Sequence, residues 1–415
     1  MLALSLMLAA PVAEAQRYAI VNGRWFDGRR FVARTMYVER GAFVDRRLAE
    51  VDSVIDLGGR FVVPPFGEAH NHNIEGARPA TVKAYLDAGI FYVKDPCSFP
   101  EAKRDAVGAL NVPTSVDAVF AGGCITGPAG HPIGLARRNI ARGVFKEGDG
   151  DGRFLHAVRD SADFERRWPA IVRAGPDFIK TILVYSEEYT QRHDDPRYVN
   201  WHGLDPALLP LVVRRAHAAG LRVSSHVESA ADFHVALEAG VDEINHLPGF
   251  RPDHDSIAGF GGDLTRYRIS PADARRAARD RVVLVTTLGA TIDLLALGDS
   301  LGLDAAARAR VRDLHVANLR LLRASGAVVA LGSDNFRANT VSEAIALRTL
   351  GVFTDAELIA MWSMMTPRAI FPGRRVGCLD AGCEASFLAL HDDPLTEFAN
   401  VQRIDIRMKQ GVLLR

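Results

Sequence analysis

The sequence predicts an α/β fold in which a (β/α)8 (TIM) barrel carries a small β-sandwich domain. The chain has 415 residues, of which 48% are hydrophobic, so it can bury a large core. Short apolar and β-branched runs alternate with longer Ala/Leu/Arg stretches of helical period, which is typical of βα units around a parallel sheet. The two ends of the chain instead have the pattern of short β-hairpins.

Eight apolar runs are the candidate barrel strands. Helix-sized intervals separate them over roughly three hundred residues, as expected for a barrel closed on itself. We expect this barrel to occupy residues 64–371. The expected strands are residues 61–65, 89–94, 116–121, 178–184, 221–226, 243–246, 282–288 and 328–332.

The two ends of the chain, residues 16–63 and 372–415, are expected to pair into one β-sandwich domain. In the N-terminal part, turn-forming Asn-Gly and Asp-Gly dipeptides interrupt stretches of alternating polarity at 18–21 and 35–38. In the C-terminal part, residues 386–390 and 404–407 have the same alternating pattern. The sandwich is therefore built from both ends.

Residues 1–15, MLALSLMLAAPVAEA, are predicted to be a cleavable signal peptide. An apolar stretch precedes the small-residue site Ala13-Glu14-Ala15, although the usual positively charged start is missing. The protein is thus expected to be periplasmic or secreted. No later run approaches the ~18 to 20 continuous apolar residues that span a bilayer, so we expect the mature form to be soluble and free of a membrane segment.

The charge balance argues for a small, roughly neutral substrate. Fifty Lys and Arg residues balance fifty Asp and Glu residues, so no net field attracts nucleic acid or an anionic membrane. We therefore expect a small-molecule substrate and no nucleic-acid partner. The composition leaves open whether the chain forms a homo-oligomer.

Four cysteines are present, at positions 97, 124, 378 and 383. Cys378 and Cys383 flank a turn-like stretch, and an oxidising compartment would permit a disulfide between them, while buried free thiols are the alternative. No CxxC pair occurs, which argues against a cysteine zinc cluster.

Five of the eight expected strands carry a candidate metal ligand at the C-terminal end, where this fold places its catalytic residues. His70 and His72 alternate with Asn71, so both imidazoles can point the same way after one strand. Taken singly, such residues have structural explanations: a lysine can extend to solvent and an aspartate can cap a helix. Six of them at one rim of one barrel instead predict a metal centre. The candidate ligands are His70, His72, Lys180, His226, His246 and Asp334.

The chain resembles a known family over several of its segments. The segments FVVPPFGEAHNHN, DFIKTI, SSHVESAADFHVALEAGVDEINHLPG, GAVVALGSDNF and RRVGCLDAGCEASFLALHDDPL follow the order of the landmarks of the metal-dependent amidohydrolase superfamily. The resemblance is strongest to the branch that contains imidazolonepropionase-like enzymes and Xaa-Pro dipeptidases. It covers nearly the whole chain after residue 15.

The resemblance implies a role for each candidate residue. His70 and His72 would bind the more buried of two Zn²⁺ ions, and His226 and His246 the more exposed one. Lys180, carboxylated to a carbamate, would bridge both ions. Asp334 would complete the first site and act as the catalytic proton acceptor.

The resemblance also implies residues that contact the substrate. His131 resembles a substrate-orienting catalytic histidine; the alternative is a loop histidine beside a proline turn. Tyr185 and Arg337 are candidate substrate-binding residues by position. Two departures are visible: Glu68 stands where the family usually has aspartate, and residues 184–189 replace a stretch of small residues, so a different pocket is expected.

The expected function is hydrolysis of a C–N bond, in an amide or peptide-like small molecule, by a metal-activated hydroxide. The substrate would be a dipeptide, an N-acyl amino acid or a cyclic amide, so a dipeptidase is one form of this enzyme. Hydrolysis of an ester, lactone or phosphotriester by the same centre is an alternative. A third reading, from a different class, is a metal-binding protein that has lost catalysis.

Overall fold

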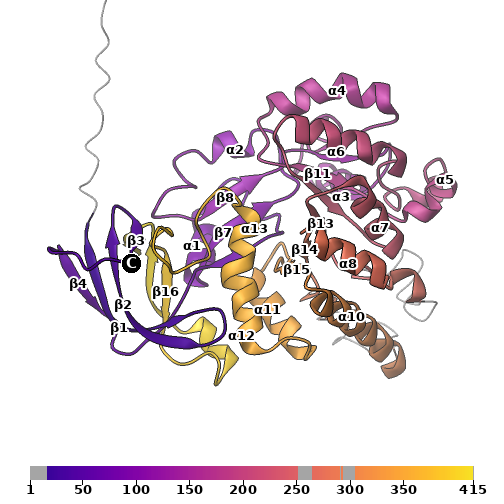
Figure 1. The fold of residues 1–415 in the computed structure, drawn as a ribbon. Coiled ribbons are helices and arrows are strands. Elements are labelled where there is room, and N and C mark those ends of the chain that lie inside the picture. The colour runs from indigo at the N-terminus through magenta and orange to yellow at the C-terminus, as the bar shows by residue number, and fades with distance from the viewer. Residues whose placement is uncertain (1–15, 251–263, 290, 293–303, 415) are drawn as a thin grey trace, which may run out of the picture.

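The computed structural model describes residues 16–250, 264–289, 291–292 and 304–414. The predicted signal peptide lies outside the described residues. The described strands form one mixed sheet and two parallel sheets, and helices cover the parallel strands (Figure 1). None of the described helices is both long enough and apolar enough to span a membrane.

The mixed sheet joins the two ends of the chain, as the sequence predicts. Its strand order is β18-β17-β16-β5-β1-β2-β3, with β4 paired to β1, and β16 runs antiparallel to β5. Figure 1 shows the indigo N-terminal strands beside the yellow C-terminal ones. These pairings make a single sheet, so two facing sheets stay a prediction. The strands are β1 (Tyr18–Phe26), β2 (Phe31–Glu39), β3 (Ala42–Val44), β4 (Ser53–Asp56), β5 (Phe61–Val63), β16 (Phe387–Leu390), β17 (Ile404–Lys409) and β18 (Val412–Leu414).

The parallel strands confirm the predicted α/β class. One sheet has the order β10-β9-β11-β12-β13-β14-β15 and the other β6-β7-β8. Backbone bonds outside the strand ladders link the two sheets, among them those from Ala69 N–H to the carbonyl of Leu331 (2.9 Å) and from Asp177 N–H to that of Phe120 (2.8 Å). Strand pairing around a full barrel is not seen among the described strands, so the closed barrel stays a prediction. The strands are β6 (Phe66–Glu68), β7 (Ile90–Asp95), β8 (Asp117–Phe120), β9 (Cys124–Thr126), β10 (Leu155–Ala157), β11 (Ile179–Ile182), β12 (Val223–His226), β13 (Glu243–Asn245), β14 (Val283–Val285) and β15 (Val328–Ala330).

The expected first barrel strand, residues 61–65, is wrong. Residues 61–63 form β5 of the mixed sheet, and the parallel sheet begins with β6 at Phe66. Pro64 and Pro65 explain the break, because proline has no N–H to donate to a strand ladder. The chain therefore passes from one sheet to the other at these two prolines. Strands β9 and β10 were not predicted.

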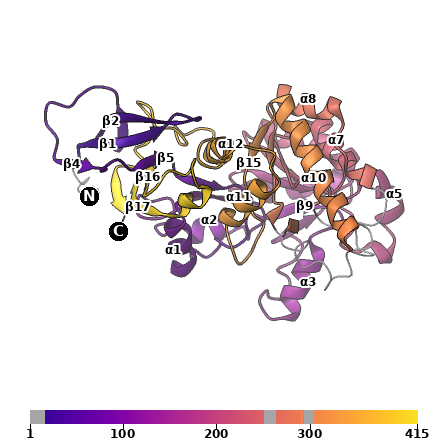
Figure 2. The ribbon, with the colours of Figure 1, turned by 90° about the horizontal axis from the view of Figure 1, so that it is seen from below.

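The helices lie around the parallel strands, and α1 also contacts the mixed sheet, because Arg407 in β17 donates to the carbonyls of Leu86 (2.9 Å) and Asp87 (2.6 Å). Figure 2 shows α7, α8 and α10 at the end of the molecule opposite β1 and β2. Cap residues define several ends: Ser229 and Asp232 form a capping box at the start of α7, and α10 ends at Gly326 with φ 75°. The helices are α1 (Pro79–Asp87), α2 (Ala102–Asp105), α3 (Ile133–Ala141), α4 (Ser161–Arg173), α5 (Tyr189–Arg192), α6 (Leu209–Ala218), α7 (Ala230–Ala239), α8 (Pro271–Arg279), α10 (Ala305–Ser325), α11 (Thr340–Thr349), α12 (Asp355–Ala360) and α13 (Thr366–Ile370).

Aromatic packing fixes β6, the strand that precedes His70. The rings of Phe66 and Trp362 stack with centroids 3.7 Å apart, and the Trp362 indole N–H donates to the carbonyl of Gly67 at 3.1 Å. A Cβ at Gly67 would lie 2.6 Å from Thr366, so only glycine fits this close approach. The core thus holds β6 in place.

A buried charge cluster ties the mixed sheet to the parallel strands. Lys409 in β17, which is fully buried, donates to Asp117 in β8 at 2.6 Å. Arg374 donates to the other oxygen of Asp117 at 2.7 Å. Two cations from the C-terminal part of the chain therefore satisfy one carboxylate in the parallel sheet.

Candidate metal centre

The six predicted ligands come together at the C-terminal ends of the parallel strands. They line one cavity of about 150 Å³. His70 and His72 follow β6, Lys180 lies in β11, His226 ends β12, His246 follows β13, and Asp334 lies four residues beyond β15. Strands that are far apart in the sequence thus deliver nitrogen and oxygen donors to one place.

The tightest group of donors consists of His70, His72 and Asp334. One donor atom from each lies within 4.8 Å of the others. Oδ1 of Asp334 is 3.4 Å from Nε2 of His72 and 3.8 Å from Nε2 of His70. The buried Nδ1 of His70 has no hydrogen-bond partner among the described residues. Two imidazoles and a carboxylate at these distances fit a divalent metal such as zinc.

The imidazole rings form a continuous row across the cavity. Ring centroids are 5.2 Å apart for His70 and His72, 4.7 Å for His70 and His246, and 4.4 Å for His246 and His226. The ring of His131 lies 5.0 Å beyond His226. The second pair of predicted ligands is therefore next to the first.

Polar side chains lie against one ring nitrogen of three of these histidines. Nδ1 of His72 lies 3.6 Å from Oδ1 of Asp95, Nδ1 of His246 lies 2.7 Å from Oγ1 of Thr287, and Nε2 of His226 lies 3.1 Å from Oε1 of Glu228. A partner on one ring nitrogen fixes the direction of the other, as is common for histidines that bind metals.

The pKa values of the first two histidines differ because of these neighbours. Burial, followed by the charge of Lys180, holds the pKa of His70 well below its ordinary value. Burial also lowers the pKa of His72, but Asp95 and Asp334 outweigh it and the net shift in pKa is upward. His70 is therefore neutral at pH 7 and has a lone pair to donate.

Lys180 is buried and its hydrogen-bond partner is a neutral amide, which is unusual for a buried lysine. Its ammonium donates to the side-chain oxygen of Asn245, whereas the buried ammonium groups of Lys94 and Lys409 donate to carboxylates, those of Glu243 (2.7 Å) and Asp117 (2.6 Å). Burial lowers the pKa of Lys180 to about 7, although Glu243 acts in the opposite direction. A substantial fraction of this amine is therefore unprotonated at neutral pH.

Several residues of the centre have left-handed backbone. His246 (φ 74°), Thr287 (φ 61°) and Asp334 (φ 45°) all have positive φ. Residues other than glycine rarely adopt this conformation, and such strain concentrates at functional sites. The surrounding structure therefore holds these side chains against a local conformational cost.

The carboxyl group of Glu68 forms hydrogen bonds next to His70 and His72. Its carboxyl accepts bonds from the N–H and hydroxyl of Ser333 (2.8 and 2.7 Å) and from the N–H of His70 (3.3 Å). Burial raises the pKa of Glu68 to about 8. The position thus keeps its carboxyl next to the ligands although glutamate replaces the family's usual aspartate.

The predicted substrate contacts are only partly on the cavity. His131 lines it, together with Arg138, Leu135 and Phe336. Tyr185 and Arg337 are not among the lining residues. Sequence analysis missed Arg138, which lies on α3, because an arginine in an amphipathic helix has the pattern of an ordinary exposed charge.

Tyr185 is completely buried and Arg337 is exposed. The Tyr185 ring lies between the guanidinium groups of Arg192 and Arg266, 4.3 and 4.4 Å from its centroid. This double cation–π contact gives Tyr185 a packing role in the loop after β11. Neither residue lines the cavity of the candidate ligands, and a role in substrate binding stays a prediction for both.

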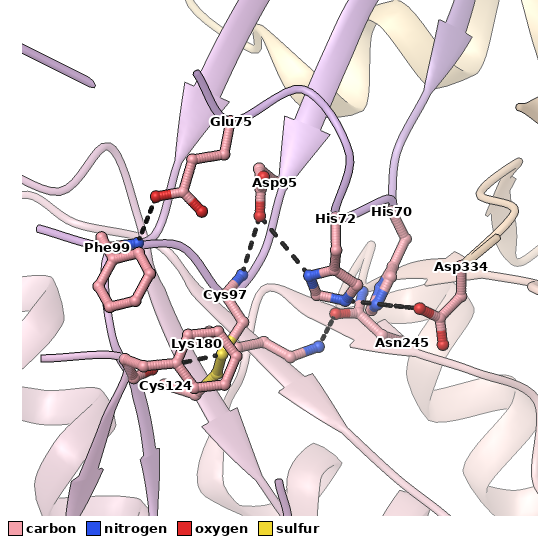
Figure 3. The surroundings of a disulfide bond; sticks show 11 residues. His70, His72, Glu75, Asp95, Cys97, Phe99, Cys124, Lys180, Asn245 and Asp334 are labelled. Carbon is pink, nitrogen blue, oxygen red and sulfur yellow. Dashed lines mark hydrogen bonds and ion pairs between the residues drawn. A yellow bond between two sulfur atoms is a disulfide. The ribbon is translucent and has the colours of Figure 1, made fainter. Parts of the chain in front are cut away.

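All four cysteines are oxidised. Cys378 pairs with Cys383, one of the two states that the sequence left open, and Cys97 pairs with Cys124 across 27 residues. Cys97 and Cys124 both line the cavity (Figure 3). The second pairing could not be predicted from spacing, because it depends on the start of β9 lying near the end of β7.

Comparison with protein-family models gives no match, and neither does comparison with curated proteins. Solved structures with the same fold include an amidohydrolase (20% identity, 96% of this chain and 98% of that one, TM-score 0.68). They also include a prolidase in complex with N-methylphosphonate-L-proline (18%, 96% and 99%, TM-score 0.69) and a Xaa-Pro dipeptidase with methionine bound in its active site (18%, 96% and 100%, TM-score 0.71). These are the kinds of protein that the sequence resembles. Over nearly its whole length, the chain has the fold of amidohydrolases and prolidases.

Proposed function

We propose that this chain is a metal-dependent member of the amidohydrolase superfamily that hydrolyses a C–N bond in a small molecule. The observation that carries the proposal is the cavity at the strand ends, which is lined by four histidines, a buried lysine and an aspartate that the sequence resemblance had assigned as ligands. Because parallel strands present their C-terminal ends on one face, this is also where the fold accommodates catalysis.

The donor set suits two zinc ions. His70, His72 and Asp334 would hold one ion, and His226 and His246 the other. A neutral Lys180 amine can add to CO₂, releasing a proton and leaving a carbamate whose two oxygens could serve both ions. When bound, zinc supplies Lewis acidity and lowers the pKa of coordinated water toward about 7.

Asp334 is the proposed proton carrier. Its Oδ1 faces both His70 and His72, so it lies at the group of donors where the nucleophilic water would be held. It would accept the proton of that water and deliver it to the leaving nitrogen. His131, next to His226, would orient the scissile carbonyl through its ring.

Arg138 narrows the substrate class. Its exposed side chain lines the cavity, and none of the described carboxylates forms a hydrogen bond or ion pair with it. A guanidinium binds a carboxylate through two parallel N–H bonds. Leu135 and Phe336 offer an apolar wall. A small amide with a free carboxylate, such as a dipeptide or an N-acyl amino acid, combines both features.

Two further predictions belong to this proposal. Export to an oxidising compartment is supported by the two disulfides, which rarely persist in a reducing cytosol. A closed (β/α)8 barrel is supported by the backbone bonds that join the segment after β6 to the segment after β15, and the end of β8 to the segment before β11.

The proposal is tested with the purified full chain and matched substrates. Dipeptides and N-acyl amino acids should be cleaved, a chelator should remove the activity, and zinc should restore it. Each amide is compared with the ester of the same acyl group. Faster cleavage of esters would favour the alternative bond class, and a protein that binds zinc but cleaves neither series would favour a metal-binding protein without catalysis.

A further inference from the structure

We infer that the Cys97–Cys124 disulfide positions the side chain of His72 in the metal centre. The oxidation state of this disulfide would therefore set the affinity of the protein for the metal. The inference deepens the proposed function, because it rests on His72 being a metal ligand. It adds a redox requirement to that function.

The disulfide forms part of the wall of the candidate active site. Both cysteines line the cavity that contains His72, and both are buried, with exposed fractions of 6% and 1%. Their Cα atoms are 5.4 Å apart, within the usual range for disulfides. Cys97 lies two residues after β7 and Cys124 begins β9. In the wall of the cavity, the disulfide therefore joins the loop after β7 to the start of β9.

One carboxylate oxygen connects the disulfide to the metal ligand. Oδ1 of Asp95 accepts a hydrogen bond from the N–H of Cys97 at 3.3 Å, and the same oxygen lies 3.6 Å from Nδ1 of His72. Figure 3 shows Asp95 between the two groups. A displacement of Cys97 therefore changes the position of the atom that orients His72.

The loop from Asp95 to Phe99 has further contacts on both sides. The N–H of Phe99 donates to Oε1 of Glu75 at 3.0 Å, only three residues beyond His72. The N–H of Ser98 donates to the carbonyl of Gly122 at 3.0 Å, next to the strand of Cys124. The loop thus lies between the segment that contains His72 and Glu75 and the segment that leads into β9. The disulfide is the covalent bond that joins the loop to β9.

Reduction would require this loop to move. A phosphine reductant takes up the oxygen of one water, cleaves the S–S bond and leaves two thiols, one proton on each sulfur. Sulfurs that are no longer bonded separate from about 2 Å to roughly 3.5–4 Å. In a close-packed wall, that separation displaces Cys97 and with it the acceptor on His72. Loss of such a partner typically weakens metal binding by about 10- to 100-fold.

The chain offers a matched control. Cys378 and Cys383 form the second disulfide, close to the mixed sheet, where the N–H of Phe43 donates to the carbonyl of Cys383. Neither cysteine lines the candidate active site. Removal of the Cys378–Cys383 disulfide, like removal of Cys97–Cys124, leaves the chain with one disulfide, but it does not change the cavity wall.

The test compares Cys97→Ser/Cys124→Ser with Cys378→Ser/Cys383→Ser in the full chain. Zinc affinity is measured by competition with a chromogenic chelator, and hydrogen exchange of residues 90–99 is measured in the metal-free proteins. We expect zinc affinity to fall by about tenfold or more, and exchange to accelerate, only in the first variant. Equal zinc affinity in the two double variants would overturn the inference.

Asp95→Asn tests the connection itself. If Asp95 carries the effect, its substitution weakens zinc binding in the oxidised chain but adds little to the Cys97→Ser/Cys124→Ser variant. Fully additive losses would show that the disulfide acts by another route and would overturn the positioning role.

If the Cys97→Ser/Cys124→Ser variant does not fold, the same question is answered by chemical reduction of the disulfide in the wild-type chain. Zinc affinity should fall on treatment with the phosphine and return on reoxidation, and the Co²⁺-substituted protein should acquire no thiolate-to-cobalt absorption. Unchanged affinity, or a thiolate band, would overturn the inference. If the oxidised wild type binds no metal, the proposed function itself fails, which is a distinct result.

Discussion

Oδ1 of Asp334 lies 3.4 Å from Nε2 of His72 and 3.8 Å from Nε2 of His70. The carboxylate thus faces both imidazoles that follow β6, although 262 residues separate positions 72 and 334. The N–H of Asp334 donates to the carbonyl of His70 at 2.8 Å, which fixes the backbone of the two segments together. This relationship makes Asp334 the first residue to test.

Asp334→Asn should lower kcat by about 10²- to 10⁴-fold, because an amide oxygen cannot take up and return a proton. The steric fit of asparagine is close, so the thermal unfolding midpoint should change little. Metal analysis of the same sample separates a catalytic loss from a loss of the ion. A variant that retains most of its kcat would remove Asp334 from the proposed mechanism.

Lys180→Ala should reduce bound zinc from about two equivalents to one or fewer, because the proposed carbamate serves both ions. Elemental analysis and a substrate assay on the same preparation give the answer. Lys83→Ala, which changes an exposed lysine on α1, is the control and should keep full occupancy. Full occupancy and activity in the Lys180 variant would show that no carbamate is needed.

Arg138→Ala should reduce kcat/KM for carboxylate-bearing amides by about 10- to 100-fold, mainly through KM, because a charge-assisted contact is lost. Cleavage of the same amides with a capped carboxyl group should not change. Arg137→Ala is the matched control, since this neighbour on α3 is exposed and does not line the cavity. Equal losses on free and capped substrates would argue against an anion-binding role.

His315 should make stability depend on pH. It is fully buried in α10, neither ring nitrogen has a hydrogen-bond partner among the described residues, and burial lowers its pKa from 6.5 to about 4. The unfolded chain therefore takes up a proton at a higher pH than the folded chain does. The neutral ring's contribution is complete above pH 6.5 and is lost as the pH falls toward 4.

His315→Leu should remove this dependence. Between pH 6.5 and 4, its unfolding free energy should fall by roughly 3 kcal/mol less than that of the wild type, as measured by denaturant unfolding. Leu314→Met, a volume-conserving change one residue away, introduces no titrating group and should keep the wild-type dependence. Identical pH profiles for wild type and His315→Leu would contradict the prediction.

The convergence of the six candidate ligands on one cavity could be predicted from the fold class, because the C-terminal ends of successive parallel strands meet on one face. His70 and His72 both lie just beyond the end of β6, so one strand brings both to that face. The boundary at Pro64 and Pro65 was also present in the sequence, since neither residue can donate to a strand ladder.

The substrate-facing residues could not be predicted in the same way. Tyr185 has the sequence position of a pocket residue, but its ring is buried against Arg192, seven residues along the chain, and against Arg266, which is distant in the sequence. The pairing of Cys97 with Cys124 likewise depends on how two loops meet in space. Loop conformation follows tertiary contacts, which periodicity does not encode.

The charge cluster around Asp117 has a consequence for biosynthesis. This carboxylate leaves the ribosome long before Arg374 and Lys409, which are its partners in the finished molecule. A buried carboxylate without a counter-ion costs several kcal/mol, so the nascent chain keeps Asp117 hydrated until both cations have been translated. Strand β8 therefore reaches its final packing late, although it is made early, and C-terminally truncated chains should be substrates for proteolytic quality control.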